Sequence, residues 1–202
     1  MSLRLSGGRK LISPAGDRAR PTPSRVRLAV FNMLASRLAG CRWLDLCSGS
    51  GVMACEALQH AAAAVVAVEQ DRRLAQLVRA NLTAVATGIG PSAGIWQVHG
   101  REVLQFLRNT DGSLTGPSPQ TFDLIYCDPP YASGLYAPVA DAIGQGNWLS
   151  PDGLLVLECA SDQIPDLPTG WELLDQRRYG GTTLLLLSCR AGCRGDTDSR
   201  RP

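Results

Sequence analysis

Lysine, histidine and paired cysteines are scarce in this chain of 202 residues. Lys10 is the only lysine among 20 basic residues, and His60 and His99 are the only histidines. Seven cysteines are scattered without a Cys-x-x-Cys pair, and the close pair Cys189 and Cys193 has no further partner. This pattern disfavours a zinc motif and a disulfide framework, so we expect no metal and a reducing, cytoplasmic location.

Long apolar runs are missing as well. No stretch approaches the ~20 apolar residues that a membrane span needs, and residues 1–11 lack the apolar centre of a secretory signal. With 45% hydrophobic and 19% charged residues, the chain can bury a core. We expect one α/β domain with a small appendage, no membrane attachment and a monomer.

The formal net charge of +2 hides an uneven distribution. Residues 1–42 carry a net charge of +8, residues 43–189 carry −8, and residues 190–202 carry +2. Nineteen of the 20 basic residues are arginine, whose planar guanidinium grips phosphate with two donors and stacks on bases. A basic first segment on an acidic body indicates a nucleic-acid-binding surface, although a solvated arginine-rich surface gives the same composition.

Strand and helix patterns alternate after this basic segment. Residues 1–40 are expected to form the appendage, with a small hairpin in 1–12 and a helix from Ser24 to about Arg37. Residues 41–189 are expected to form the main domain, and residues 190–202 a disordered tail. Strands are expected at 43–47, 64–69, 95–99, 122–127 and 153–159, helices at 52–60, 71–85, 102–108 and 135–144, and a closing antiparallel hairpin at 171–179 and 182–188. This order predicts a Rossmann-like, mostly parallel sheet.

The carboxyl ends of the first two strands carry the signature of a cofactor site. Asp45 and the loop from Ser48 to Gly51 follow the first strand, and Glu69 ends the second. Gly49 and Gly51 permit close backbone approach to a ligand, and an acid at the second strand end can accept both hydroxyls of a ribose. The pattern indicates an adenosine-containing cofactor, either NAD or S-adenosylmethionine.

Three acids in this region admit two interpretations each. Asp45 would repel a pyrophosphate but suits the ammonium and sulfonium of S-adenosylmethionine, unless it only braces the turn. Glu69 holds the ribose or is a solvated acid at a helix start. Glu102, after the third strand, reaches the adenine amine or complements the dipole of a helix N-terminus.

The sharpest signal is the sequence from Asp128 to Tyr131, Asp-Pro-Pro-Tyr, at the end of the fourth strand. Pro129 and Pro130 fix the backbone and remove two N–H donors, which leaves the Asp128 carboxylate and the Pro129 carbonyl as acceptors. Two hydrogen-bond acceptors beside an aromatic ring suit the exocyclic amine of a base that stacks on Tyr131. Asp128 would orient the amine first and accept its proton second, and a base in a duplex would have to be flipped out.

The chain resembles the class I S-adenosylmethionine-dependent methyltransferases, and more closely the RsmD family of 16S rRNA guanine-N2 methyltransferases. The resemblance runs from about residue 3 to 188 and rests on SGGRKL (6–11), RPTPSRVR (20–27), FNML (31–34), LDLCSGSG (44–51), EAL (56–58), VEQD (68–71), DPPY (128–131) and LVLE (155–158). The glycine loop and DPPY specify the wider class, whereas the string that begins at residue 20 singles out this family.

The resemblance implies roles for particular residues. It implies that Asp45, Gly49, Gly51 and Glu69 hold S-adenosylmethionine, that residues 128–131 hold the guanine, and that the appendage touches rRNA or a small-subunit assembly intermediate. The residues expected to face the RNA are Arg20, Thr22, Arg25 and Arg27, unless they brace the appendage on the main domain. Leu28 replaces a usual glutamate, and Cys47-Ser48 replace an aromatic–alanine pair.

Three other functions remain open at this point. An adenine-N6 methyltransferase acting on DNA or RNA would use the same motif, because the acceptors read an amine rather than one base. A NAD-dependent oxidoreductase would leave the motif at Asp128 unexplained and would need a general acid that neither histidine supplies. A non-catalytic RNA-binding module would need neither Asp128 nor a cofactor.

Overall fold

The computed structural model describes residues 3–14, 22–108, 121–130 and 133–190. Its helices are α1 (Ser24–Met33), α2 (Ala35–Leu38), α3 (Val52–Gln59), α4 (Arg72–Ile89), α5 (Val103–Arg108) and α6 (Tyr136–Gln145). Its strands are β1 (Arg42–Leu46), β2 (Ala64–Val68), β3 (Ile95–His99), β4 (Phe122–Cys127), β5 (Leu149–Ala160), β6 (Trp171–Tyr179) and β7 (Thr182–Cys189).

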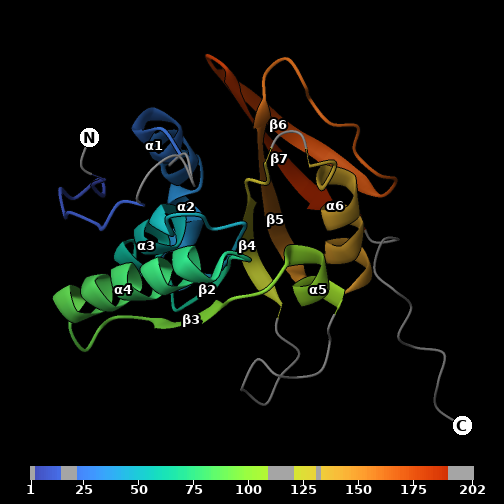
Figure 1. Cartoon of the computed structure of the whole chain (residues 1–202). Helices are drawn as coiled ribbons and strands as arrows, with labels where there is room; N and C mark the ends of the chain where they lie inside the picture. Colours follow the sequence, from blue (N-terminus) through green and yellow to red (C-terminus); the bar gives the residue numbers. More distant parts are fainter. Residues whose placement is uncertain (1–2, 15–21, 109–120, 131–132, 191–202) are drawn as a thin grey trace, which may run out of the picture.

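These strands form one sheet in the order β3-β2-β1-β4-β5-β7-β6 (Figure 1). Neighbours from β3 to β5 are parallel, whereas β7 runs antiparallel to both β5 and β6. The predicted Rossmann-like, mostly parallel sheet with a closing antiparallel hairpin is therefore confirmed. Parallel order brings the carboxyl ends of β1, β2, β4 and β5 to one edge, where such sheets bind ligands.

Helices cover both faces of the sheet (Figure 1). One face packs against α1 to α4, and the other packs against α5 and α6. Helix α4 shows why: Leu74, Val78, Leu82 and Val85 recur at helical spacing and are buried, and Asp71 caps its first turn. The central strands are buried on both faces, which explains their nearly continuous apolar sequences.

The first segment packs onto the α3 face of the sheet. A bridge joins Arg4 to Lys10, and Leu5, Leu11 and Val30 belong to the same buried cluster as the residues of α3. The expected tail lies outside the described residues from 191 onward. In the part of the chain that the structure describes, no helix combines the length and apolarity needed to cross a bilayer.

The helix expected at 71–85 continues to Ile89 in α4, and two other boundaries also differ from the structure. The expected helix of residues 24–37 is interrupted at Leu34, where φ is −99° and ψ is 7°, so that α1 and α2 are separate. Strand β5 begins at Leu149 rather than at 153, because the Phe122 end of β4 pairs with Leu149 across a register shift. None of these differences moves the carboxyl ends of the strands.

Candidate active site

The loop after β1 turns back on itself through left-handed backbone conformations. Cys47, Gly49 and Gly51 have φ angles of 61°, 53° and 73°, and the Ser48 N–H donates to the Val68 carbonyl at 3.0 Å. A Cβ atom at Gly51 would lie 2.8 Å from Val78 Cγ1. Only glycine fits there, so the loop forms a backbone cradle at the start of α3.

Glu69 lies beside this loop rather than in solvent. It is 7% exposed, and its two carboxylate oxygens accept the Gly49 N–H at 2.8 Å and the Asp71 N–H at 2.9 Å. A carboxylate has about four acceptor positions, so Glu69 keeps capacity for a ribose diol while it ties the loop to β2. The alternative of a solvated helix-start acid is wrong for this residue.

Asp45 is buried beneath the same loop. Its Oδ2 accepts the Ala54 N–H at 3.1 Å, and Ser48 Oγ donates to the Asp45 carbonyl at 2.8 Å. Loss of solvation raises the pKa of Asp45 to about 7, against the lowering effect of the Ala54 and Ser48 hydrogen bonds. The carboxylate thus braces α3, and it has no cationic partner among the residues that the structure describes.

Glu102 caps the start of a helix, which is the second of its two expected interpretations. Its two carboxylate oxygens accept the N–H groups of Leu104 at 2.9 Å and Gln105 at 2.8 Å, at the start of α5. These donors are the unpaired N–H groups that any helix start presents. The structure therefore shows the helix-capping interpretation of Glu102, and because two acceptor positions remain, as on Glu69, its contact with an adenine stays a prediction.

The end of β4 brings the Asp-Pro-Pro sequence to the same edge. The Asp128 N–H lies 3.5 Å from the Leu46 carbonyl at the end of β1, so the glycine loop and Asp128 are neighbours. Asp128 is partly buried, Pro129 is buried and Pro130 is exposed. Tyr131 lies outside the described residues, so its expected stacking on a base stays a prediction.

Three carboxyl groups gather at this edge, on Asp45, Asp128 and Glu158. Burial raises the pKa of Asp128 well above its usual value, and the negative charges of Glu158 and Asp45 add to the effect. Burial also raises the pKa of Glu158. None of the three forms an ion pair with an arginine or lysine in the described ranges.

This electrostatic environment distinguishes the two cofactor candidates. Uncompensated acids repel the pyrophosphate of NAD, whereas a positively charged ligand relieves their mutual repulsion. The glycine cradle, the remaining acceptor capacity of Glu69 and the acids at Asp45 and Asp128 fit S-adenosylmethionine. Within the described segments, no three His, Cys, Asp or Glu side chains are grouped as metal ligands would be.

Sequence reasoning missed a hydrogen-bonded network beside Asp128. The hydroxyl of Tyr126, in β4, donates to Glu158 Oε2, and the hydroxyl of Tyr136 donates to the Glu158 carbonyl at 3.2 Å. Thr22, from the first segment, lies near the Tyr126 hydroxyl and acts to lower its pKa, against the larger raising effect of burial. The sequence did carry a signal for this network, because Tyr126 and Glu158 are polar side chains near the ends of apolar strands, as Glu69 is.

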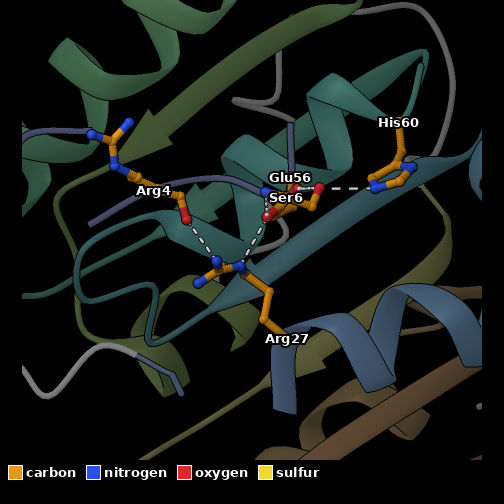
Figure 2. Close-up of polar contacts among 5 residues, drawn as sticks. All are labelled: Arg4, Ser6, Arg27, Glu56 and His60. Atoms are coloured by element: carbon orange, nitrogen blue, oxygen red, sulfur yellow. Dashed lines mark hydrogen bonds and ion pairs between the residues drawn. The ribbon is translucent and has the colours of Figure 1, made fainter. Parts of the chain in front are cut away.

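Thr22 and Arg27 do not face outward, contrary to the expected RNA contacts. Thr22 is 8% and Arg27 is 5% exposed. Figure 2 shows that the Arg27 guanidinium points at Glu56 of α3, with 2.8 Å between Nε and Oε1, while its Nη2 donates to the Arg4 carbonyl at 2.6 Å. Glu56 also accepts the N–H and hydroxyl of Ser6. Arg27 is therefore a brace between the first segment and α3.

Arg25 is the one expected RNA contact that the described residues leave exposed. Its Nη2 donates to the Tyr179 carbonyl at 2.9 Å, at the tip of the β6–β7 hairpin. Arg20 lies outside the described residues, and its role stays a prediction.

Known proteins resemble this chain over most of its length. The family model described as "Conserved hypothetical protein 95" matches residues 5–188. Ribosomal RNA small subunit methyltransferase D of Escherichia coli K12 is 29% identical over 95% of this chain and 90% of its own. The Haemophilus influenzae protein of that name is 30% identical over 86% and 84%. The solved structure of the putative methyltransferase yhhF from Escherichia coli superimposes with a TM-score of 0.78 and 26% identity, covering 95% of this chain and 99% of its own.

Proposed function

The chain belongs to the Conserved hypothetical protein 95 family, that of the ribosomal RNA small subunit methyltransferases D, and from this premise we propose which reaction it catalyses. It is an S-adenosylmethionine-dependent rRNA methyltransferase. The acceptor that we propose is the exocyclic N2 amine of one guanine in 16S rRNA. The partner is 16S rRNA or a small-subunit assembly intermediate, met in the cytoplasm, and the enzyme acts as a monomer.

One observation carries this proposal: the end of β4 lies against the glycine loop. The Asp128 N–H approaches the Leu46 carbonyl at 3.5 Å, so a base held by Asp128 and Pro129 would face a ligand held by the loop and Glu69. Methyl transfer from a sulfonium is an in-line displacement, which needs alignment more than it needs acid–base help. Alignment of that kind contributes roughly 7–11 kcal/mol to lowering a barrier.

The cofactor and the chain divide the work between them. Bound S-adenosylmethionine supplies a methyl group on a positively charged sulfur. The Asp128 carboxylate and the Pro129 carbonyl accept the two N–H bonds of the guanine amine, which turns the nitrogen lone pair toward the methyl carbon. Formation of the C–N bond would break the C–S bond and leave S-adenosylhomocysteine, and the positively charged amine would release a proton to Asp128 or to water.

The raised pKa of Asp128 fits this role only with a cation nearby. Without a ligand, burial and the charges of Glu158 and Asp45 raise the pKa of Asp128, which favours the protonated carboxyl group. A sulfonium close to this edge favours the ionised form. The acceptor function of Asp128 is thus coupled to cofactor binding, so an unloaded enzyme would bind the guanine amine poorly.

The test is to map modified nucleotides in 16S rRNA from cells with and without the gene. We expect one N2-methylguanosine that disappears on deletion and returns with the wild-type gene but not with Asp128→Ala. Calorimetry with S-adenosylhomocysteine should show that Asp128→Ala still binds the cofactor product, because Asp45, Glu69 and the loop are intact.

The outcomes separate the alternatives. A lost methyl group on an adenine N6 would replace the guanine assignment with the adenine one. An unchanged set of rRNA modifications would refute the proposed substrate, and full activity of Asp128→Ala would refute the role of Asp128.

A further inference from the structure

The β6–β7 hairpin ends in a two-residue turn at the substrate edge of the sheet. Gly180 and Gly181 join Tyr179 to Thr182, which pair with each other. Thr182 also pairs with Ala160, the last residue of β5. Cys127, next to Asp128, pairs with Leu157. Measured along the strands, Thr182 therefore lies three residues beyond Cys127, or about 10 Å at ~3.3 Å per residue, and β5 lies between the hairpin and β4.

Hydrogen bonds fix this turn against β5. The Ser161 N–H donates to the Gly181 carbonyl at 2.9 Å, and Ser161 Oγ donates to the Gly180 carbonyl at 3.1 Å. Gly180 has a φ of +69°, which an ordinary side chain rarely adopts. The turn is thus a built feature with a defined position relative to the active site.

Two exposed arginines from distant parts of the sequence meet at this turn. Arg25, at the start of α1, donates Nη2 to the Tyr179 carbonyl at 2.9 Å. Arg178, in β6, donates Nε to the Gly180 carbonyl at 3.1 Å. The end of the hairpin and α1 lie on the same side of the molecule in Figure 1. Each guanidinium has five N–H donors, so most remain for a ligand.

The charge of these two arginines is not neutralised within the described ranges. The nearby Arg177 is paired with Asp175 at 2.7 Å, but neither Arg25 nor Arg178 has a carboxylate within ion-pair distance there. The positive end of the α1 dipole lies beside Arg25 and adds to the local field. Two guanidiniums without a carboxylate partner lie on a turn at the same sheet edge as the carboxyl groups of Asp45 and Asp128. This arrangement fits a nucleic acid whose phosphates contact the arginines while its uncharged base approaches Asp128.

We propose that Arg25 and Arg178 bind the RNA phosphodiester backbone next to the flipped guanine, and this rests on the proposed function. One arginine comes from α1 and the other from β6, so each would bind its own phosphate. Phosphate contacts set the position of the strand and carry no base information. The arginines would thereby hold the strand while the target nucleotide leaves its stack and reaches Asp128.

The test measures binding of 16S rRNA across a range of salt concentrations, in the presence of S-adenosylhomocysteine. Arg25→Ala and Arg178→Ala should each lower the slope of log K against log salt by about 0.7–0.9, which corresponds to about five- to eightfold weaker binding at 0.1 M salt. The double variant should lose about twice as much slope. In methyl-transfer assays, KM for the RNA should rise while kcat stays close to that of the wild type.

Arg37 provides a matched control. It is exposed, and its Nη1 donates to the Asp152 carbonyl at 2.8 Å, which parallels the contact of Arg25. It lies at the opposite edge of the sheet, near the beginnings of β1 and β5, so Arg37→Ala should leave binding and its slope unchanged. Slopes of Arg25→Ala and Arg178→Ala that match that of Arg37→Ala would overturn the inference.

A second pair of variants tests the turn without removing an arginine. A Cβ atom at Gly180 would lie 2.3 Å from Arg25 Nη2, whereas one at Gly181 would meet nothing within 4 Å. Gly180→Ala should displace the Arg25 guanidinium and weaken RNA binding, and Gly181→Ala should not. Equal binding by the two variants would count against the inference. RNA binding and methylation are measured in separate assays. A wild-type enzyme that binds RNA but methylates no guanine would therefore refute the proposed function and not this inference.

Discussion

The Arg27–Glu56 pair gives the strongest prediction for stability. Both side chains are almost fully buried, at 6% and 1% exposure. Arg27→Leu would remove the counter-charge from Glu56 and the hydrogen bond to the Arg4 carbonyl, while Ser6 would remain as the nearest donor. Breaking a buried pair from one side costs about 3–5 kcal/mol, because the other charge stays in a poorly solvated site. We expect a loss of that size in the free energy of unfolding.

Two further variants show where this energy comes from. Ser6→Ala should cost only about 1–3 kcal/mol, because it removes a single hydroxyl donor from the carboxylate and leaves the backbone N–H in place. Arg27→Leu combined with Glu56→Leu should recover much of the loss, since an apolar pair of similar size replaces both charges. The recovery would be incomplete, because the Ser6 N–H then lacks its acceptor.

Urea unfolding followed by circular dichroism measures these differences. The slope of the free energy against urea should stay constant across the four proteins, so that the midpoints compare directly. A loss below about 1 kcal/mol for Arg27→Leu would refute the reasoning, because a solvated guanidinium facing RNA would cost that little. Arg25→Ala serves as the contrast, since it should change RNA binding and leave the unfolding midpoint nearly unchanged.

Four other predictions concern the site itself. Affinity for S-adenosylmethionine should rise with pH and level off above about pH 7. The reason is that Asp45, with its pKa raised from 3.8 to about 7, must lose a proton to face a cation. Calorimetry at several pH values measures this, and an equal dependence of affinity on pH in Asp45→Asn would contradict it. In the unliganded protein the same shift makes stability fall as pH rises from about 4 to 7, because the folded state holds the proton more tightly. Glu158→Gln should move the acidic side of the pH profile of kcat/KM to lower pH, because the charge of Glu158 contributes to the raised pKa of Asp128. An unchanged pH profile would show that the two groups do not interact in the enzyme with bound cofactor. Gly51→Ala should lower stability by about 1–3 kcal/mol and weaken cofactor binding, because it combines a φ of +73° with a contact of 2.8 Å. Gly8→Ala, which has a φ of +82° and open space around it, should cost less, and equal melting temperatures of the two variants would exclude the steric part.

The strand order and the meeting of the motifs could be predicted because they follow from local patterns. Apolar runs such as 64–68 and 122–127 mark buried strands, and parallel order then places Asp45, Glu69 and Asp128 at one edge. The side chains confirm this arrangement at Glu69, which accepts the Gly49 N–H. No knowledge of distant contacts was needed for that step.

The partners of individual charges could not be predicted in the same way. Arg25 and Arg27 are two residues apart in one helix, yet Arg25 is exposed and Arg27 is buried against Glu56. The burial depends on where α3 lies, 29 residues later in the chain. Glu102 is similar, because its position before α5 allows both a ligand contact and a helix cap, and only the backbone geometry shows that it forms the cap.

The strand order has a consequence for how such an enzyme can change its target. Strands β1, β2 and β3 lie on one side of the junction between β1 and β4, and β4, β5, β7 and β6 lie on the other. The glycine loop, Asp45 and Glu69, which fit the methyl donor, come from the first set, whereas Asp128, which faces both ligands, and Arg178 come from the second. Substitutions after Asp128 can therefore alter which nucleotide is accepted while the glycine loop, Asp45 and Glu69 stay intact, so the two specificities can diverge separately.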